Sequence, residues 1–453
     1  MPSIIADLQI HSKYSRAVSQ KMDLFEVSRW ASKKGISLVA TGDWTHPMWF
    51  RQIKTQLQEK VPGIFALKQP PLEQKQPVHF FLSTEISSIY TQGGKMRRVH
   101  NLIFSPSIAT CEKIIRELER RGANLLSDGR PIVGISSKIL LELALAIDEK
   151  ILFIPAHAWT PWFSLFGSKS GFDSIEECFG DLSKYIYAIE TGLSSDPIMN
   201  WQIKELDTRS ILSFSDAHSG PKLGREATVF VPQEKSLQTH VSYTYDDIAQ
   251  AIKQNPTGKL KIGYTIEFFP EEGKYHWSGH RNCDVRLNPQ QVKEKGTICS
   301  VCKQPLTIGV EDRVMAISSK TIVPEDLVFS KNKVGVTFVC DKEKKRRPFV
   351  SLVSLASILL ETMHNSPTKS MAEYERLVST VGSEFDILLK KTYEEIEKHG
   401  GSKLASAIKI VRERQVFVDP GYDGVFGKVQ VFSQQKTPSV SEKKDNENQP
   451  SLF

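Results

Sequence analysis

The chain has 453 residues, of which 40% are hydrophobic and 25% are charged, as in ordinary globular proteins of about two to four domains. Its net charge of +7 weakly favours an anionic partner, and its six cysteines are too few for the disulfide scaffold of a small secreted protein. The sequence has neither a signal-peptide pattern nor an apolar run of membrane-spanning length. We therefore expect a cytoplasmic protein that does not bind membranes.

The first half of the chain alternates β-branched segments with amphipathic ones. The predicted strands cover residues 4–10, 37–41, 79–83, 98–104, 151–156, 187–191 and 210–215. Apolar residues at helical spacing predict helices at residues 24–34, 108–121, 137–149 and 174–182. This alternation indicates an α/β domain over residues 1–235, built from parallel βαβ units that close into a barrel or form an open sheet.

The pattern changes after about residue 235. A polar segment leads into a module rich in Cys and His, so we expect a linker and a zinc-binding module at residues 236–315. Helical spacing at residues 352–363, 371–377, 385–398 and 404–414 predicts a mainly helical, DNA-binding domain at residues 316–432. Residues 433–453 are almost free of apolar side chains up to the last few positions and are expected to form a flexible tail.

Acidic or imidazole side chains lie at or near one end of every predicted strand. The candidates are Asp7, His11, Asp43, His46, Glu85, His100, His157, Glu190, Asp216 and His218, of which Asp7, Asp43 and His46 are the most dispensable. Any one of them alone would more often be a capping or turn residue. Because the carboxyl ends of parallel strands converge on one face of a barrel, together they would crowd one pocket. Packed carboxylates require cations, so the pattern predicts divalent metals such as Zn²⁺, Mn²⁺ or Mg²⁺.

These stretches, from Asp7 to His218, resemble the PHP (polymerase and histidinol phosphatase) family. The resemblance implies a distorted seven-stranded (β/α)7 barrel with two or three divalent metals, in which Asp216, His218 and Glu85 are catalytic. It assigns one metal to His11, Glu85 and Asp216, a second to Glu85, His100 and His157, and a third to Asp43 and His218. The usual His-x-His motif is Gln9-x-His11 here, so Gln9 could bind a metal only through its carbonyl oxygen. Closely spaced metals of this kind favour phosphoester hydrolysis.

A second metal pattern follows in the Cys-rich module. His280, Cys283, Cys299 and Cys302 form two x₂-spaced pairs separated by fifteen residues. This spacing predicts a structural, tetrahedral Zn²⁺ site. His276 is an alternative fourth ligand, and two unrelated buried cysteines are the alternative to a metal site. The isolated Cys111, Cys178 and Cys340 are predicted to be small core residues.

The barrel, the zinc module and the helical region together resemble the bacterial type of the endonuclease Q family. The matching stretches are residues 155–163, 190–197, 215–226 and 418–427. The resemblance implies a DNA repair endonuclease that cuts the backbone 5′ to uracil, hypoxanthine, xanthine or an abasic site. Such an enzyme lifts a base out of the stack. Candidate contacts to DNA are Trp159, Trp162, Phe163, Lys169 and Arg225. The aromatic residues could instead pack the loop in which they lie. The basic residues could instead be ordinary charges on the surface.

The last five residues, Gln449-Pro-Ser-Leu-Phe453, resemble the peptide by which bacterial repair proteins bind the sliding clamp. Gln449, Leu452 and Phe453 would make the contact, and a chance apolar end is the alternative. Two other functions remain open. A PHP-type small-molecule phosphatase would need neither the zinc module nor the clamp peptide. A non-catalytic DNA- or clamp-binding module would have a decayed barrel, of which Gln9 is the only sign.

Overall fold

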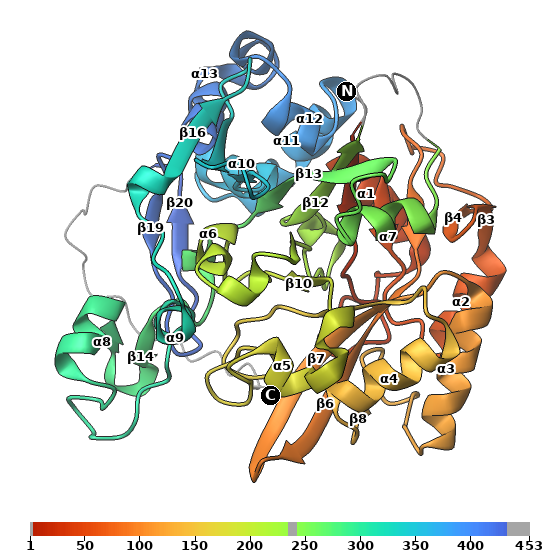
Figure 1. The fold of residues 1–453 in the computed structure, drawn as a ribbon. Helices are drawn as coiled ribbons and strands as arrows, with labels where there is room; N and C mark the ends of the chain where they lie inside the picture. The colour runs from red at the N-terminus through yellow and green to blue at the C-terminus, as the bar shows by residue number, and fades with distance from the viewer. Residues whose placement is uncertain (1–2, 234–241, 433–453) are drawn as a thin grey trace.

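The computed structural model describes residues 3–233 and 242–432, and its largest element is a mixed sheet of ten strands (Figure 1). β1 lies parallel to β2 and antiparallel to β12 within this sheet. From one edge to the other the strands are β16 (Leu327–Lys331), β17 (Thr337–Asp341), β18 (Phe349–Ser351), β13 (Leu260–Glu267), β12 (Ala227–Pro232), β1 (Ile4–Asp7), β2 (Leu38–Ala40), β5 (His79–Phe81), β4 (Ile64–Leu67) and β3 (Leu57–Val61).

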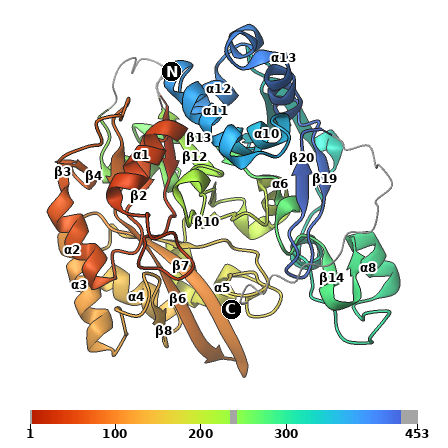
Figure 2. The same cartoon turned by 180° about the vertical axis from the view of Figure 1, so that it is seen from behind.

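A second sheet has four strands: β8 (Ile132–Val133), β6 (Ser83–Gln92), β7 (Lys95–Phe104) and β9 (Leu152–Pro155). β6 and β7 form a long antiparallel hairpin that projects from the body of the molecule (Figures 1 and 2). The hairpin turns at Gly93 and Gly94, where φ is 60° and 72°, a conformation that favours glycine. Two further strands, β10 (Ala188–Glu190) and β11 (Ser210–Leu212), pair in parallel.

Seven strands follow one another around a common centre, in the order β1, β2, β5, β7, β9, β10 and β11; we call them the strand ring. The amide of Ala158, after β9, donates to the carbonyl oxygen of Glu190 in β10 at 2.9 Å. A bridge between Ile10 and Ala217 brings the segment after β11 back beside the segment after β1. The ring is filled, because every one of its strands contributes to one buried apolar cluster, with side chains such as Ala6, Leu38, Phe81, Leu102, Ile154, Ala188 and Leu212.

Helices pack along the outside of the strand ring. Capping residues in the sequence define where these helices begin and end. α1 begins after Asp23, whose side chain accepts a hydrogen bond from the amide of Glu26, and ends at Gly35, where φ is 89°. A side chain at Gly35 would also meet Ser383, since an added Cβ would lie 2.5 Å from its Oγ. The helices of the first half are α1 (Leu24–Lys34), α2 (Pro47–Gln56), α3 (Ile108–Arg120), α4 (Ser137–Ile147), α5 (Ile175–Phe179), α6 (Pro197–Trp201) and α7 (Tyr245–Ile252).

The predicted strands and helices of the first half are confirmed as elements, and α1 has the predicted bounds, residues 24–34. The expectation of parallel strands throughout is wrong for β7, which is antiparallel to both β6 and β9. The hairpin was not expected. As a result, His100 lies in the middle of β7 rather than at the start of a strand, and Glu85 lies inside β6 rather than after a strand.

The region after residue 315 contains strands as well as the expected helices. The helices are α10 (Leu355–Thr362), α11 (Pro367–Thr380), α12 (Glu384–Leu389) and α13 (Tyr393–Arg412), and a small hairpin follows with β19 (Phe417–Asp419) and β20 (Lys428–Gln430). β18 pairs in parallel with β13, so β16, β17 and β18 extend the main sheet. The sheet therefore crosses the expected domain boundaries near residues 235 and 315, and the division into domains stays a prediction.

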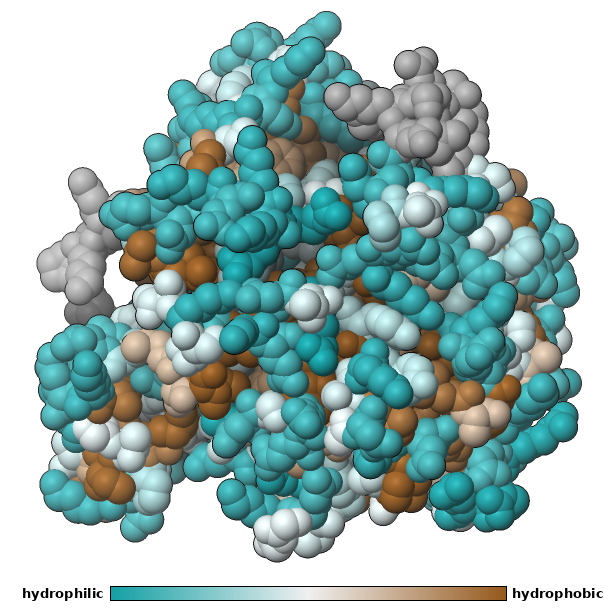
Figure 3. Space-filling model, in the orientation of Figure 1, coloured by the Kyte–Doolittle hydropathy of each residue, from teal (hydrophilic) through white to brown (hydrophobic). Residues whose placement is uncertain are grey.

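Between these regions lies the Cys-rich module, with β14 (Ser278–His280), β15 (Val285–Leu287), α8 (Pro289–Lys295) and α9 (Val310–Ile317). Figures 1 and 2 show α8 and β14 at one corner of the molecule and α10 to α13 gathered at another. Short 3₁₀ helices complete the chain: η1 (Gly180–Tyr185), η2 (Lys204–Leu206), η3 (Gly220–Lys222), η4 (Pro270–Glu272), η5 (Arg281–Cys283) and η6 (Pro324–Asp326). The face in Figure 3 is mostly hydrophilic, with small apolar patches. Within residues 3–233 and 242–432, every helix is too short or too polar to cross a membrane.

Candidate metal centre

One group of potential ligands follows two neighbouring strands of the ring. His11 comes after β1, and Asp216 and His218 come after β11; their ligand atoms all lie within 4.8 Å of one another. His11 Nε2 lies 3.2 Å from Asp216 Oδ1 and 3.2 Å from Glu85 Oε2. Atoms that share an ion at about 2.0–2.2 Å stand roughly 3.0–3.5 Å apart, so these spacings fit a common divalent metal.

A second group consists of Glu85, His100 and His157, again within 4.8 Å of one another. Glu85 Oε1 lies 2.5 Å from His100 Nδ1 and 3.4 Å from His157 Nε2. The other carboxylate oxygen of Glu85 faces His11. Glu85 therefore lies between the two groups and has one oxygen directed to each, which is the arrangement of a bridging carboxylate.

Asp43 lies behind His11 rather than among the ligand atoms of either group. Its Oδ1 is 2.9 Å from His11 Nδ1, and its Oδ2 accepts hydrogen bonds from the amide and hydroxyl of Ser12 and the hydroxyl of Ser15. Both oxygens are thus occupied within the protein. A carboxylate that holds the distal nitrogen of an imidazole fixes the ring so that the other nitrogen faces a metal. Asp43 has the geometry of such an orienting residue.

The loop of Asp216 is held by the protein main chain and by Arg225. The Nε of Arg225 donates to the carbonyl oxygen of Ser215 at 2.8 Å, and its Nη2 donates to that of Asp216 at 3.3 Å. His218 Nδ1 lies 2.8 Å from the same Asp216 oxygen, so Nδ1–H donates there and Nε2 is left to bind a metal. These contacts give Arg225 a role in positioning Asp216, and its expected contact with DNA stays a prediction.

Backbone conformation supports the same location for the site. Asp43, His157 and Asp216 have positive φ angles of 48°, 30° and 47°, which non-glycine residues rarely adopt. Such strain persists where the surrounding structure imposes it, and it is most frequent at functional sites. Each of the three residues lies just after a ring strand, so the strained turns surround a single centre.

Several buried oxygen atoms at this centre accept no hydrogen bond from the described residues: Gln9 Oε1, Glu190 Oε1 and Asp216 Oδ1. Gln9 Nε2 donates to Glu85 Oε2 at 2.7 Å, and Glu190 Oε2 accepts from the amide of His157. A buried oxygen without a donor costs roughly 1–3 kcal/mol unless a cation binds it. The residues present therefore fit divalent metals, and Gln9 presents the carbonyl oxygen that the altered motif requires.

Two of the imidazoles have the protonation state that a metal ligand requires. Burial lowers the pKa of His100 to about 4 and lowers that of His218, so both imidazoles are neutral near pH 7. Burial has the same tendency at His11 and His157, but the carboxylates of Asp43 and Glu85 raise the pKa of these two rings, which would lose a proton when a metal binds. Burial alone would raise the pKa of Glu85, but contacts with His100, Arg130 and His11 hold it well below its usual range. Burial raises the pKa of Glu190 to about 8. Metal ligands must be deprotonated, and Glu190 would reach that state when a nearby cation lowers its pKa.

Arg130 is the residue of this centre that sequence reasoning missed. It lies in the loop between α3 and β8, and its Nη1 is 3.6 Å from Glu85 Oε1. The loop has no strand or helix pattern around it. No local signal in the sequence indicates that it reaches the metal-binding residues.

The aromatic loop, residues 157–172, contains the predicted base contacts. Trp159 is only 1% exposed and donates its indole N–H to Asn200 Oδ1 at 2.8 Å, so it packs the loop and does not face DNA. Phe163 is half-buried, with its ring centroid 4.9 Å from that of His100. Trp162 is also half-buried and packs edge-on against Tyr275. Lys169 is exposed on the same loop.

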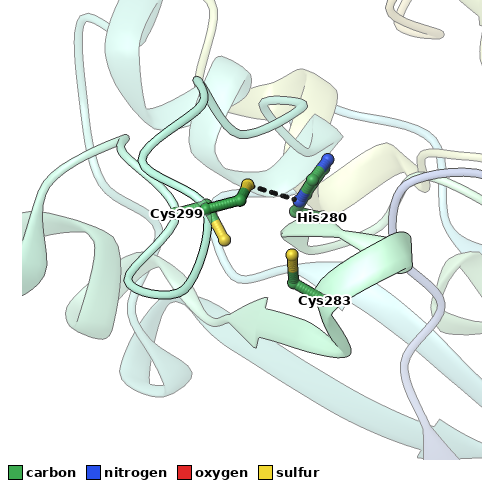
Figure 4. A group of neighbouring side chains, drawn as sticks. His280, Cys283 and Cys299 are labelled. Atoms are coloured by element: carbon green, nitrogen blue, oxygen red, sulfur yellow. Dashed lines mark hydrogen bonds between the residues drawn. The ribbon is translucent and has the colours of Figure 1, made fainter.

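The four predicted zinc ligands come together in the Cys-rich module, with His280, Cys283, Cys299 and Cys302 all within 4.8 Å (Figure 4). Cys302 Sγ lies 3.3 Å from His280 Nδ1. Hydrogen bonding from the main-chain N–H of Cys302 lowers the pKa of Cys299 to about 6, which favours the thiolate that a metal requires. The set of three sulfurs and one nitrogen fits a tetrahedral Zn²⁺.

His276 is not part of this group. Its Nε2 lies 3.5 Å from Glu311 Oε2, on α9, and burial lowers its pKa to about 4. Cys111 and Cys178 are buried, as predicted, whereas Cys340 is only half-buried on β17. The predicted clamp-binding residues Gln449, Leu452 and Phe453 lie outside the described residues.

No protein-family model matches the chain, but two solved structures match it over nearly its whole length. The lesion-specific endonuclease PfuEndoQ from Pyrococcus furiosus has 27% sequence identity and a TM-score of 0.76, and the match covers 95% of both chains. Endonuclease Q in complex with a 27-mer duplex substrate with an abasic lesion at the active site has 28% identity and a TM-score of 0.77, over 95% of this chain and 96% of that one. The chain is similar to endonuclease Q in fold and sequence over 95% of its length.

Two curated relatives of unknown function also match. The Methanocaldococcus jannaschii protein MJ0043 is 29% identical over 284 residues, which are 62% of this chain and 32% of that relative, so the match spans about a third of its length. The Bacillus subtilis protein YqxK is 26% identical over 448 residues, which cover 95% of this chain and 100% of that relative. The match to YqxK therefore extends over the whole of that protein.

Proposed function

We propose that this chain is a DNA repair endonuclease that hydrolyses the phosphodiester backbone 5′ to a deaminated base (uracil, hypoxanthine or xanthine) or an abasic site. The observation that carries the proposal is the fold, which the chain shares with an endonuclease Q that was solved with an abasic duplex at the active site. The position of Glu85 between two groups of potential metal ligands supports it.

The strand ring is, on this proposal, a distorted (β/α)7 PHP barrel, and its centre holds two divalent metals. His11, Glu85, Asp216 and His218 would bind one, and Glu85, His100 and His157 the other, with Gln9 and Glu190 as further oxygen donors. When bound, such ions polarise a phosphoryl oxygen and lower the pKa of water. The protein fixes the ligand geometry: Asp43 orients His11, and Arg225 holds the Asp216 loop. The expected third metal at Asp43 is not part of the proposal, because both Asp43 oxygens are already hydrogen-bonded.

DNA would reach this centre past the aromatic loop. Trp162 and Phe163 are the half-buried rings next to the metal-binding residues, and Phe163 contacts the ring of His100. Stacking on an aromatic ring stabilises a base outside the helix by about 1–3 kcal/mol. The exposed Lys169 is placed to meet a phosphate on the same side. The zinc module and residues 316–432 would extend the DNA-binding surface.

The decisive experiment compares duplexes that differ only in the lesion. Wild-type protein with Mn²⁺ is expected to nick duplexes with an abasic site, uracil or hypoxanthine on the 5′ side of the lesion, and to leave an undamaged duplex intact. Asp216→Asn should abolish nicking and retain DNA binding. Asp246→Asn is the matched control, because Asp246 pairs with Lys150 on the surface, away from the metal centre. Equal nicking of undamaged DNA, or faster hydrolysis of small phosphomonoesters, would contradict the proposal and favour the phosphatase alternative.

We also propose that the terminal Gln449-Pro-Ser-Leu-Phe453 peptide binds a bacterial sliding clamp. The support is the sequence pattern alone. A labelled peptide of residues 440–453 should bind purified clamp, and a Leu452→Ala, Phe453→Ala double variant should not. Equal binding by both peptides would contradict this partner.

A further inference from the structure

Arg130 differs from the other arginines near the metal centre because its guanidinium group makes no hydrogen bond to the described residues. The nearest acceptor is Glu85 Oε1, 3.6 Å from Nη1, which is too long for a hydrogen bond. By contrast, the guanidinium of Arg225 donates to the carbonyl oxygens of Ser215 and Asp216. The Arg130 side chain is 24% exposed, so its free N–H groups are open to a ligand at the centre.

The main chain holds Arg130 firmly in this position. Its amide donates to Asp128 Oδ1 at 3.0 Å, and the amide of the preceding Gly129 donates to the carbonyl oxygen of Tyr14 at 3.1 Å. A Cβ on Gly129 would lie only 2.5 Å from Asp43 Oδ2, so the loop is pressed against the residue that orients His11. These contacts fix the main chain of Arg130 beside the metal-binding residues, within reach of Glu85 for its side chain.

The positive charge of Arg130 is unfavourable next to bound metal ions. Two divalent ions bring four positive charges, which the carboxylates of Glu85, Asp216, Asp43 and, once it is deprotonated, Glu190 would balance, so the guanidinium of Arg130 adds a positive charge that no carboxylate of the centre offsets. Like charges in a partly buried site repel strongly. Such an arrangement is favourable when an anion lies between the metals and the guanidinium, and guanidinium matches a phosphate with two parallel N–H···O bonds.

We propose that Arg130 binds the DNA phosphate that is cut, by donating hydrogen bonds to its non-bridging oxygens. The proposal rests on the function given above. Arg130 neither takes up nor gives up a proton, because guanidinium stays charged at all working pH values. It holds the phosphate against the metal-binding face, and its donors are already in place as negative charge grows on the phosphoryl oxygens.

Neutralising this phosphate tests the contact directly. Duplexes with an abasic site would carry either a normal phosphate or an uncharged methylphosphonate at the position 5′ to the lesion, and binding would be measured by anisotropy in Ca²⁺. Wild-type protein is expected to bind the methylphosphonate duplex at least about tenfold more weakly. Arg130→Met should bind the normal duplex more weakly and reduce this discrimination at least about fivefold. Arg130→Lys should keep an intermediate discrimination, because it retains the charge.

Arg16→Met is the matched control, because Arg16 is 68% exposed and pairs with Asp128 of the same loop. It should discriminate as wild type does. Metal content and thermal stability are measured for each variant. The role of Arg130 is overturned if wild type nicks lesion DNA and Arg130→Met discriminates between the two duplexes as wild type does. It is also overturned if Arg130→Met loses bound metal and its discrimination stays unchanged. Failure of wild type to nick any lesion duplex would overturn both the role and the proposed function.

Discussion

The Nε of Arg313, in α9, donates to the main-chain carbonyl oxygen of Phe166, in the aromatic loop, at 2.8 Å. The Nη2 of the same side chain donates to the carbonyl oxygen of Phe172 at 3.0 Å and to Asp173 at 2.6 Å. α9 belongs to the Cys-rich module, and the aromatic loop carries His157. One guanidinium therefore joins the Cys-rich module to the loop of His157 at the candidate metal centre.

Replacing Arg313 with Met should loosen this loop. Three hydrogen bonds are lost, two carbonyl oxygens lose their donor, and we expect the free energy of unfolding to fall by about 2–3 kcal/mol. Nicking of abasic DNA should fall about tenfold or more, because His157 and Phe163 lose their fixed positions. Thermal denaturation and single-turnover nicking measure the two effects. Arg120→Met, at a 70% exposed ion pair on α3, should change neither; unchanged nicking by Arg313→Met would show that the loop does not need this contact.

The zinc site should support the same loop from a greater distance. Cys299→Ser is expected to remove the bound zinc and to lower both the melting temperature and nicking, because structural zinc contributes directly to folding. Metal analysis of the purified protein gives the zinc content. Cys340→Ser is the control, since Cys340 lies on β17 outside the module, and it should retain zinc. A full equivalent of zinc in Cys299→Ser would contradict the assigned ligand set.

The gathering of these residues at one candidate metal centre was largely predictable, because most of them follow short β-branched segments. His11, His157 and Asp216 lie just after β1, β9 and β11, where a local pattern reveals them. Glu85 and His100 were named for the same reason, although they belong to a hairpin. The strand pairing was not predictable, because the polar, exposed end of β6 and β7 obscures the alternation of a strand.

Features that depend on contacts between distant segments could not be predicted from local patterns. Arg130 reaches Glu85 because its loop packs on Asp43, more than eighty residues earlier in the chain. Trp159 is a candidate DNA contact by its place in the sequence, yet its indole is buried against Asn200, which agrees with the alternative of loop packing. β18 joins the main sheet through pairing with β13, more than eighty residues earlier in the chain, and β17 and β16 follow it at the edge of the sheet.

Asp43→Asn should weaken metal binding without unfolding the protein. The neutral amide is a poorer acceptor for His11 Nδ1–H, so the imidazole loses orientation and basicity, and losses of about 10–100-fold in metal affinity are typical for such orienting residues. Titration calorimetry with Mn²⁺ and the Mn²⁺ dependence of nicking would measure the change. Asp148→Asn, which alters a hydrogen bond to Thr110 away from the centre, should leave the Mn²⁺ affinity as it is. Equal Mn²⁺ affinity in Asp43→Asn would exclude the orienting role.

A buried pair of glutamates makes stability depend on pH. Glu226 and Glu267 are fully buried and face each other across β12 and β13, next to the pair Ala227 and Ile266. Burial raises the pKa of Glu267 to about 8, and burial with the nearby charge of Glu267 raises that of Glu226 well above its usual range. Glu267 titrates near 4.5 when unfolded. The folded protein therefore holds extra protons between pH 4.5 and about 8, and the free energy of unfolding falls as pH rises through this interval.

Glu267→Gln should remove much of this dependence. The variant keeps the shape of a protonated glutamate, so its melting temperature should decrease less than that of wild type between about pH 6 and pH 8.5, a difference on the order of a few kcal/mol in unfolding free energy. Thermal denaturation across this range gives the comparison. Glu343→Gln, at an exposed pair with Lys345, should follow the wild-type curve. Parallel curves for wild type and Glu267→Gln would mean that Glu267 is not protonated in the folded protein.

The pairing of β18 with β13 makes the first half of the chain depend on the second half. β13 has β12 on one side, and residues 349–351 supply its other neighbour. A shorter chain that stopped near residue 315 would leave a bare sheet edge, which recruits other chains and aggregates. The first half of the chain therefore depends on residues 349–351 to cover the edge of its sheet, and the shared sheet joins the two halves into one folding unit. By contrast, β14 and β15 of the Cys-rich module form a separate small sheet that this unit does not need for its own edge.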